Sequence, residues 1–215
     1  MPLGSPTMAE LPYSDDDLSL LRPRAKVLLR KRMRQLRGTL PAEARARRSA
    51  AVAARVLALP CWQSARSVAL YASMPDEFDT RALLDDAVAR GLDVALPVVG
   101  EGRVLSFRWL VRAGQRFPTA LSAFGIDEPT DAAPEVDLAT LDVVIVPALA
   151  MDPRGHRLGF GRALYDNTLA LMTQAARVAT VFAFQMIAEV PNEAHDQRVH
   201  FIVTDEDTYR VDDAP

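Results

Sequence analysis

The sequence predicts an α/β fold in a single domain: an open, mostly parallel sheet flanked by helices, with a basic pair of helices at its N-terminus. Three observations lead to this prediction. Apolar, β-prone runs alternate with amphipathic helical segments, which is the order of a parallel sheet covered by helices. The run DVVIV at 142–146 is almost continuously apolar, as expected of a central strand. With 215 residues, 49% of them hydrophobic, the chain can build one full core.

The first helical segment is basic. Pro23 suits a first helical turn, and Gly38 ends the helix. An apolar stripe recurs along it at helical spacing, at Leu29, Met33, Leu36 and Leu40. A row of cations flanks that stripe, at Lys26, Arg30, Arg34 and Arg37. A second helix runs from Pro41 to about Leu59. We place the domain at residues 23–210 and expect residues 1–22 to form a poorly ordered leader.

Charge is segregated along the chain. The net charge is only −3, yet residues 22–66 hold thirteen Arg or Lys and one acid, Glu43. The basic segment therefore meets either an anionic ligand or the acidic remainder of its own chain. A solvated basic face and a nucleic-acid-binding face are the alternatives. The second is weakened because no aromatic residues interleave with the cations.

The remaining elements alternate between strand and helix. Strands are expected at 67–72, 93–99, 104–110, 142–146, 177–184 and 201–204, and helices at 80–90 and 161–172. A loop rich in Gly and Pro spans about 112–141. Ligands of such folds bind at the carboxyl ends of the strands, so the loops that follow Ala72, Val146 and Phe184 form the candidate site.

The segment 147–169, PALAMDPRGHRLGFGRALYDNTL, joins a strand to a helix through several glycines and arginines. Glycines at such a junction let backbone N–H groups approach an anion closely, and the helix N-terminus favours negative charge. The segment has neither the ending of a Walker A loop nor the spacing of a dinucleotide fingerprint. It predicts a phosphate site, the alternative being a tight connection without a ligand. The candidate residues are Arg157, Gly159, Gly161, Arg162, Tyr165 and Asp166.

Other loops supply candidate acids. Asp166 and Asp196 can together hold one hydrated Mg²⁺, which is usually bound by one or two carboxylates with phosphate oxygens and water. Taken singly, each is an ordinary surface residue in the simpler interpretation. Glu77 can accept hydrogen bonds from the N–H groups of a heterocycle, with plain exposure as the alternative. The three histidines show no metal-ligand spacing, so no zinc site is predicted.

Composition narrows the setting. The single cysteine, Cys61, excludes an internal disulfide and favours a reducing compartment. No stretch approaches the ~20 apolar residues of a membrane span, and the N-terminus lacks the pattern of a signal peptide. We therefore expect a cytoplasmic monomer or weak homodimer that binds small molecules, and neither nucleic acid nor membrane.

Five blocks of sequence carry a family resemblance: AKVLLR at 25–30, MPDEFDT at 74–80, FGIDEP at 124–129, VPALAMDPRGHRLGFGRALYD at 146–166 and PNEAHDQRVHFIVTD at 191–205. In this order and spacing they resemble 5-formyltetrahydrofolate cyclo-ligase, a family also called methenyltetrahydrofolate synthetase. The similarity is collinear from about Arg24 to Asp205. The fold it implies, one α/β domain with a central parallel-type sheet, agrees with the pattern of the elements.

The resemblance implies a reaction. Such enzymes use ATP and magnesium to close 5-formyltetrahydrofolate to 5,10-methenyltetrahydrofolate, with release of ADP and phosphate. Phosphorylation of the formyl oxygen activates its carbon, which N10 of the folate attacks before phosphate departs. Phosphoryl transfer rests on positioning and charge neutralisation, so cations and a metal should surround the γ-phosphate.

The resemblance also implies roles for individual residues. ATP contacts fall to Lys26, Arg30, Arg157, Gly159, Gly161, Arg162, Tyr165 and Asp166. Catalytic roles fall to Lys26, Arg157 and Tyr165, and the magnesium ligands are Asp166 and Asp196. The folate wall comprises Tyr71, Met74, Glu77, Phe124 and Tyr165.

The glycine loop departs from the family's pattern. The family normally continues Gly-x-Gly-Gly-Gly-Tyr-Tyr-Asp, or has lysine at the middle glycine, whereas residues 159–166 read GFGRALYD. Arg162 stands in for the lysine, Ala163 replaces a glycine and Leu164 replaces an aromatic residue. If the backbone at Ala163 needs positive φ, strain of about 1 kcal/mol follows. His200 stands where the family usually has aspartate. These departures leave open a diverged paralogue that binds ATP but acts on another substrate, or binds folate without turnover.

Overall fold

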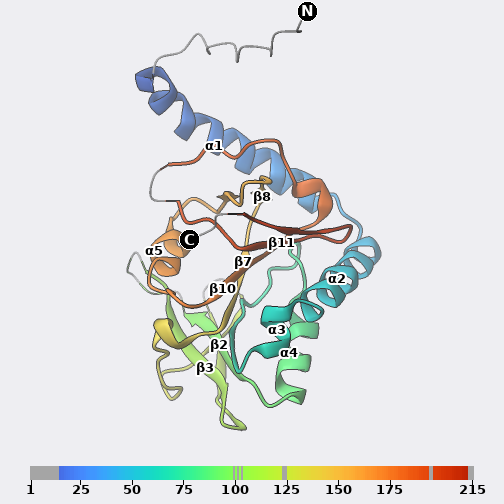
Figure 1. The fold of residues 1–215 in the computed structure, drawn as a ribbon, viewed down its shortest axis with the longest axis vertical. Coiled ribbons are helices and arrows are strands. Elements are labelled where there is room, and N and C mark those ends of the chain that lie inside the picture. The colour runs from blue at the N-terminus through green and yellow to red at the C-terminus, as the bar shows by residue number, and fades with distance from the viewer. Residues whose placement is uncertain are drawn as a thin grey trace, which may run out of the picture.

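The computed structural model describes residues 15–98, 100, 102, 104–122, 125–193 and 196–212. Its centre is an eight-stranded sheet with the strand order β12-β11-β10-β7-β1-β2-β3-β4 (Figure 1). In chain order these strands are β1 (Ser67–Ala69), β2 (Asp93–Val98), β3 (Ser106–Arg112), β4 (Gln115–Arg116), β7 (Val143–Pro147), β10 (Ala176–Thr180), β11 (Phe201–Val203) and β12 (Thr208–Arg210).

The sheet is parallel in the middle and antiparallel at its edges. Strands β11, β10, β7, β1 and β2 pair in parallel, while β12, β3 and β4 are antiparallel additions. Every residue of β7 is buried, which is why its sequence is apolar without alternation. The predicted mostly parallel sheet is confirmed. The chain order reverses between β1 and β7, so the loops after these two strands diverge and leave a crevice.

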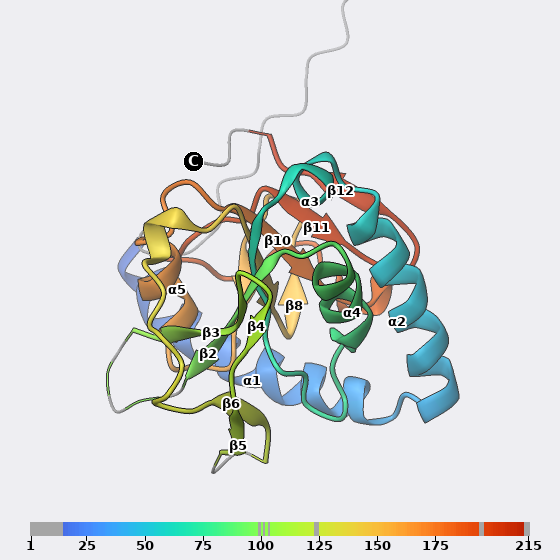
Figure 2. The same ribbon diagram turned by 90° about the horizontal axis from the view of Figure 1, so that it is seen from below.

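Helices cover both faces of the sheet. In Figure 2, α2 (Ala42–Leu57), α3 (Pro60–Ser64) and α4 (Arg81–Ala89) lie on one side, and α5 (Leu164–Leu169) with the 3₁₀ turn η1 (Leu138–Thr140) lies on the other. Two apolar clusters fill the layers, one centred on Trp62 and Leu83 and the other on Phe107 and Leu169. No helix within the described ranges is both long and apolar enough to cross a membrane.

Helix α1 (Asp15–Gly38) crosses the molecule at the carboxyl ends of the strands (Figure 1). Met33 is buried and Leu29 packs beside it against the hairpin of β8 (Ala150–Met151) and β9 (Arg157–Leu158). Two expectations for this helix are wrong. It begins at Asp15, so Pro23 lies inside the helix and not in its first turn. Leu36 is 43% exposed, since the helix docks on a narrower apolar face than the stripe suggested.

Several other bounds differ from those predicted. Helix α5 is limited to Leu164–Leu169, because positive φ at Ala163 blocks an earlier start. The strand expected at 177–184 ends at Thr180, and the chain turns into the 3₁₀ helix η2 (Ala183–Gln185). The expected loop at 112–141 contains η1 and the strand pair β5 (Thr119–Leu121) and β6 (Asp127–Pro129). Short elements of this kind carry too little periodicity to be recognised.

Candidate functional site

A cavity of about 480 Å³ opens at the crevice between β1 and β7, beneath α1. Twelve of the thirteen site residues expected from the sequence line it: Lys26, Arg30, Tyr71, Met74, Glu77, Arg157, Gly159, Gly161, Arg162, Tyr165, Asp166 and Asp196. The thirteenth, Phe124, lies outside the described residues. Segments far apart in the chain therefore converge on one cavity, as the strand-end argument predicts.

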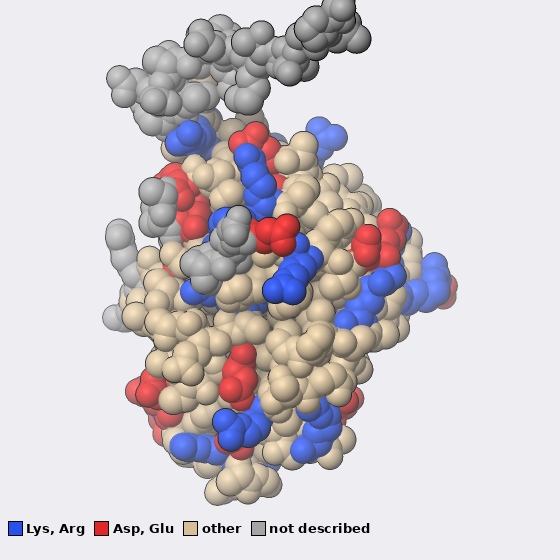
Figure 3. Space-filling view, in the orientation of Figure 1, with Lys and Arg blue, Asp and Glu red and all other residues tan. Residues whose placement is uncertain are grey.

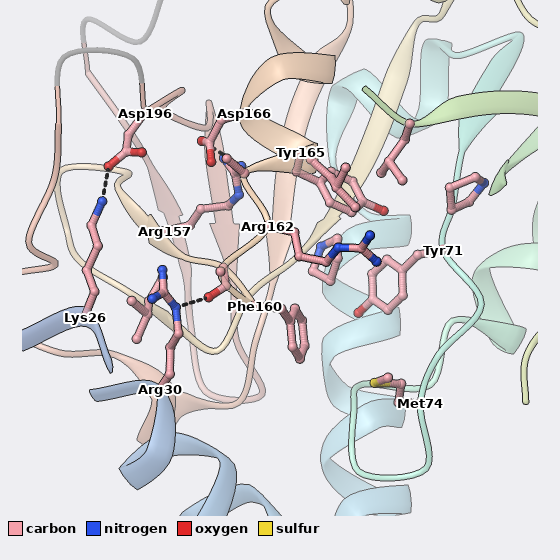
Figure 4. A pocket seen from close by; sticks show the side chains of 18 of the residues that line it. Lys26, Arg30, Tyr71, Met74, Arg157, Phe160, Arg162, Tyr165, Asp166 and Asp196 are labelled. Carbon is pink, nitrogen blue, oxygen red and sulfur yellow. Dashed lines mark hydrogen bonds and ion pairs between the residues drawn. The ribbon is translucent and has the colours of Figure 1, made fainter. Parts of the chain in front are cut away.

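One end of the cavity, here called the charged end, consists of Lys26, Arg157, Asp166, Glu193 and Asp196. Lys26 Nζ lies 3.0 Å from Asp196 Oδ2 and 3.1 Å from Glu193 Oε1. Arg157 Nη2 lies 2.7 Å from Asp166 Oδ1. Figure 4 places the two aspartates at the same end of the cavity, each facing a cation. Two cations and three carboxylates from three segments of chain therefore meet there, which leaves one negative charge in excess.

Gln197 connects these segments. Its backbone N–H donates to Asp166 Oδ1 over 3.2 Å, and its carbonyl accepts from Arg157 Nη1 over 3.1 Å. Its side-chain oxygen accepts from Arg177 Nη1 over 3.2 Å. Arg177 is buried behind the site and also donates to the carbonyl of Leu169 at the end of α5. Burial and the nearby charge of Arg157 lower the pKa of Arg177. Arg177 thus supports the charged end without lining it.

Helix α1 binds the glycine loop directly. Arg30 Nε donates to the carbonyl of Gly159 over 2.9 Å. Gly161 has φ +103°, and a Cβ there would lie 3.4 Å from the Arg30 guanidinium. Glycine is therefore favoured at position 161 by its backbone angle, while a Cβ there would make only ordinary van der Waals contact with Arg30. Burial and the charge of Arg34 lower the pKa of Arg30.

The opposite end, here called the aromatic end, consists of Tyr71, Met74, Glu77 and Tyr165. Glu77 is buried, and Oε2 accepts from the Met74 N–H over 2.9 Å while Oε1 lies 3.3 Å from Arg37 Nη1. Burial raises the pKa of Glu77, although the Met74 amide and Arg37 oppose the rise. Each carboxylate oxygen keeps a second lone pair, so Glu77 can still accept hydrogen bonds from a ligand.

Two phenols flank Glu77. Tyr71 OH lies 3.2 Å from Thr180 Oγ1, and burial, then the charge of Glu77, raises its pKa. Burial and Glu77 likewise raise the pKa of Tyr165, while Arg157 opposes the rise. Tyr165 lines the cavity and in Figure 4 lies between Asp166 of the charged end and Tyr71 of the aromatic end.

The backbone of the glycine loop has positive φ at Ala163, one of the positions at which the loop departs from the family's pattern. Ala163 adopts φ +52°, a left-handed conformation that favours glycine, and both Ala163 and Leu164 line the cavity. Arg162 extends toward Tyr71, on the side of the aromatic end (Figure 4). His200 accepts from the Arg177 N–H over 2.8 Å at Nδ1, away from the cavity wall, so it contributes to strand pairing.

Three residues of the site were not identified from the sequence. Glu193 precedes Asp196 by three residues, and this spacing of acids was the available signal. Arg37 was placed only in the basic row, yet it is 3% exposed and also pairs with Asp76 over 2.9 Å. Phe160 lies under two guanidinium groups, 5.4 Å from Arg37 and 5.9 Å from Arg34, and no pattern in the sequence pointed to it.

The acids of the charged end fit an incomplete magnesium site. No group of three or more candidate metal ligands occurs in the part of the chain that the structure describes. Asp166 and Asp196 therefore do not form a complete protein site. They match the chemistry of Mg²⁺, which often keeps one or two carboxylates and completes its shell with phosphate oxygens and water.

Comparisons with known proteins identify the family of this chain. The model of the 5-formyltetrahydrofolate cyclo-ligase family matches residues 22–205. A protein of Mycolicibacterium smegmatis named 5-formyltetrahydrofolate cyclo-ligase is 34% identical, over 86% of this chain and 95% of its own. The mouse protein of that name is 27% identical over 81% of this chain and 91% of its own.

Solved structures agree as well. That of Aquifex aeolicus 5,10-methenyltetrahydrofolate synthetase superimposes with a TM-score of 0.77 at 30% identity, covering 88% of this chain and 94% of that one. A synthetase from Mycoplasma pneumoniae shares the fold, with a TM-score of 0.68 at 18% identity, over 84% of this chain and 98% of its own. The chain therefore belongs to the 5-formyltetrahydrofolate cyclo-ligase family.

Proposed function

We propose that this protein converts 5-formyltetrahydrofolate to 5,10-methenyltetrahydrofolate, using ATP and Mg²⁺ and releasing ADP and phosphate. The observation that carries the proposal is the division of one cavity into two unlike ends. The charged end offers cations and carboxylates suited to a polyphosphate, and the aromatic end offers a buried acceptor between phenols, suited to a heterocycle. Tyr165, which lines the cavity between these two ends, would lie where the two substrates meet.

Binding of ATP requires the charged end to exchange partners. Lys26 leaves Asp196, and Arg157 leaves Asp166. Both then contact phosphate oxygens, because a polyphosphate carries more negative charge than a carboxylate. The two aspartates are then available to Mg²⁺, which would neutralise charge on the phosphates when bound. Arg30 and the glycines at 159 and 161 are placed to complete the phosphate contacts from the roof of the cavity.

Folate recognition falls to the aromatic end. The amino and ring N–H groups of the pterin donate to the free lone pairs of Glu77, which Arg37 and the Met74 amide hold in position. The ring lies against Tyr71 and Met74. This arrangement directs the formyl group toward Tyr165 and the phosphates, which is the positioning that phosphoryl transfer requires.

The proposed reaction has two chemical steps. The formyl oxygen attacks the γ-phosphorus, the bond to the β–γ bridging oxygen breaks, and ADP leaves. N10 then attacks the activated formyl carbon, a C–N bond forms, and the carbon–oxygen bond breaks as phosphate leaves with the formyl oxygen. The proton from N10 passes to the departing phosphate. Lys26 and Arg157 stabilise the negative charge that moves between the oxygens.

The charge distribution favours this proposal over nucleic-acid binding. The basic row of α1 is turned to its own chain, since Lys26, Arg30 and Arg37 contact acids or carbonyls around the cavity. On the face drawn in Figure 3, Lys and Arg alternate with Asp and Glu and form no continuous stripe. A steeply salt-dependent affinity for nucleic acid would speak for that alternative.

One observation favours a diverged paralogue as the second candidate. Ala163 and Leu164 line the cavity where the family usually places glycine and an aromatic residue, so the wall facing the substrate is altered. Such a paralogue would bind ATP but leave 5-formyltetrahydrofolate unchanged.

The test is ATP- and Mg²⁺-dependent conversion of 5-formyltetrahydrofolate, followed by the near-ultraviolet absorbance of the methenyl product. Lys26→Met should lower kcat/KM by about 10²–10³-fold, since removal of one preorganised hydrogen-bond donor to a developing negative charge has an effect of that size. Lys31→Met is the matched control, because Lys31 is an exposed residue of the same helix. Absence of turnover in the wild type, with ATP binding intact, would favour the paralogue. Equal effects of the two substitutions would contradict the role of Lys26.

A further inference from the structure

Asp152 is a fully buried carboxylate that no step of the proposed reaction uses. It follows β8 in the turn that leads to β9, its side chain has no exposed surface, and it does not line the cavity. A buried carboxylate is costly unless hydrogen bonds satisfy both of its oxygens. The contacts of Asp152 must therefore offset the cost of its burial.

The Asp152 carboxylate joins two segments of chain. Oδ1 accepts from the backbone N–H groups of Arg154 and His156 over 2.9 and 3.1 Å, which closes the turn between β8 and β9. Oδ2 accepts from the Val190 N–H over 3.0 Å and lies 3.3 Å from His156 Nδ1. The Arg154 guanidinium is farther away, 3.9 Å from Oδ2, and pairs with Glu189. One buried group thus connects the turn to the segment that contains Val190.

Both connected segments lead to the charged end. The turn continues into β9, whose first residue is Arg157. The segment after Val190 contains Glu193 and Asp196, whose carboxylates pair with Lys26. Val190 also belongs to the apolar cluster on which α1 docks, and α1 supplies Lys26. Asp152 therefore lies at the junction between the cations and the acids of the charged end.

The turn itself is held in place from its other side. Gly155 has φ +86°, and a Cβ there would lie 3.0 Å from the Val199 carbonyl oxygen and 3.0 Å from Val211 Cγ1. The Gly155 carbonyl accepts from the Val199 N–H over 3.1 Å. Because the turn is fixed in this way, the hydrogen bond from Val190 to Asp152 fixes the acid-bearing segment relative to Arg157.

We propose that Asp152 is a positioning residue of the charged end, which sets the separation between Arg157 and the acids at 193 and 196. The proposal rests on the proposed function for the identity of the ligand. ATP must displace the ion pairs of Lys26 and Arg157, and the two segments must keep their separation while these pairs exchange. Groups that orient the ligands of a phosphate-bound metal ion from behind commonly contribute about 10–100-fold to affinity or activity.

Asp152→Asn tests the role by binding. The substitution keeps the shape of the side chain but replaces one acceptor by a donor, which then faces an N–H group. Calorimetry should show that a non-hydrolysable ATP analogue with Mg²⁺ binds about ten- to a hundredfold more weakly, while the affinity for 5-formyltetrahydrofolate is unchanged.

Asp142→Asn is the matched control. Asp142 Oδ2 accepts from the backbone N–H groups of Arg66 and Ser67, each over 2.9 Å, at the end of β7 away from the cavity. Its substitution should lower the free energy of unfolding and leave the affinity for the nucleotide unchanged. Equal weakening of nucleotide binding in the two variants would show general destabilisation and overturn the positioning role.

Amide hydrogen exchange tests the same role without a ligand. The N–H groups of Glu193 and Gln197 donate to Asp196 and Asp166 over 2.9 and 3.2 Å. In Asp152→Asn both amides should exchange about tenfold faster, whereas in Asp142→Asn they should exchange as in the wild type. Unchanged exchange of both amides in Asp152→Asn would overturn the proposal.

His156→Ala decides the question if Asp152→Asn does not fold. It removes only the side-chain contact at Asp152 Oδ2 and should weaken nucleotide binding by about two- to fivefold. Nucleotide affinity equal to that of the wild type would then overturn the role of Asp152.

The same measurements separate this inference from the proposed function. Normal turnover, with equal nucleotide affinity in the wild type and Asp152→Asn, would overturn the positioning role and leave the proposed function intact. A wild type that binds no nucleotide would overturn the proposed function. Faster exchange of the Glu193 and Gln197 amides in Asp152→Asn would then still support the positioning role, and unchanged exchange would overturn it.

Discussion

The two ends of the cavity are prepared for their ligands in different ways. At the charged end, cations from α1 and β9 pair with carboxylates from α5 and from residues 193–196, so a ligand must displace existing ion pairs. At the aromatic end, Glu77 is held by Arg37 and the Met74 amide on its inner side and keeps acceptor capacity for a ligand. On the proposed function, the charged end must rearrange its ion pairs to bind a ligand, whereas the aromatic end is already formed.

The largest expected effect comes from breaking the charged end at Asp166. Asp166→Asn should lower kcat/KM for ATP by about 10²–10³-fold, because it removes both the partner of Arg157 and a proposed ligand of Mg²⁺. Affinity for 5-formyltetrahydrofolate should be unchanged. Glu189→Gln, which breaks the surface pair with Arg154, is the control and should leave the rates unaltered. A loss of folate affinity in Asp166→Asn would contradict the separation of the two ends.

A smaller effect is expected behind the charged end. Arg177→Met should lower kcat/KM for ATP by about tenfold, because Gln197 loses the contact that fixes its hold on Arg157 and Asp166. The value corresponds to about 1.4 kcal/mol of transition-state stabilisation. Arg177 is a positioning residue, so KM for 5-formyltetrahydrofolate should stay the same. Arg108→Met, at the far edge of the sheet, controls for general loss of an arginine. Equal losses of kcat/KM for ATP in both variants would contradict the positioning role of Arg177.

The strained alanines give a matched pair of substitutions. Ala163 and Ala113 have φ of +52° and +49°, so Ala→Gly at either position should raise the free energy of unfolding by about 1 kcal/mol. Only Ala163 lines the cavity. Ala163→Gly combined with Leu164→Tyr should therefore raise activity on 5-formyltetrahydrofolate, and Ala113→Gly should not. Chemical denaturation and the absorbance assay measure the two effects. Unchanged activity in the double variant would mean that the rest of the wall accommodates the altered loop.

The smallest effect concerns pH. Burial raises the pKa of Glu77 above its usual 4.5, so in the acidic range the folded protein binds a proton more readily than the unfolded chain. The contribution of Glu77 to stability is present below pH 4.5 and is lost as the pH rises through the folded pKa. The free energy of unfolding of the wild type, measured relative to Glu77→Gln, should therefore fall as the pH rises from 4 to 7. A relative stability that rises over this range would contradict the burial of this carboxyl group.

The sequence was a good guide to Arg157 and Asp166, because both lie in the glycine-rich segment that follows a predictable strand. The run at 142–146 is apolar enough to mark the central strand, and the loop after it contains Arg157 and Asp166. The sequence was a poorer guide to contacts that depend on packing. The burial of Arg37 beside Glu77, and the position of Phe160 under two arginines, arise only when α1 docks. The strands β4–β6 are likewise too short to be predicted from the sequence.

The division of the cavity is tested most directly by a crossed binding experiment. Calorimetry would measure a non-hydrolysable ATP analogue with Mg²⁺, and separately 5-formyltetrahydrofolate, on the wild type, Lys26→Met and Glu77→Gln. Lys26→Met should weaken only the nucleotide, and Glu77→Gln should weaken only the folate, by about ten- to a hundredfold for lost charged hydrogen bonds. Loss of both ligands in either variant, or the reverse pattern, would contradict the assignment of the two ends.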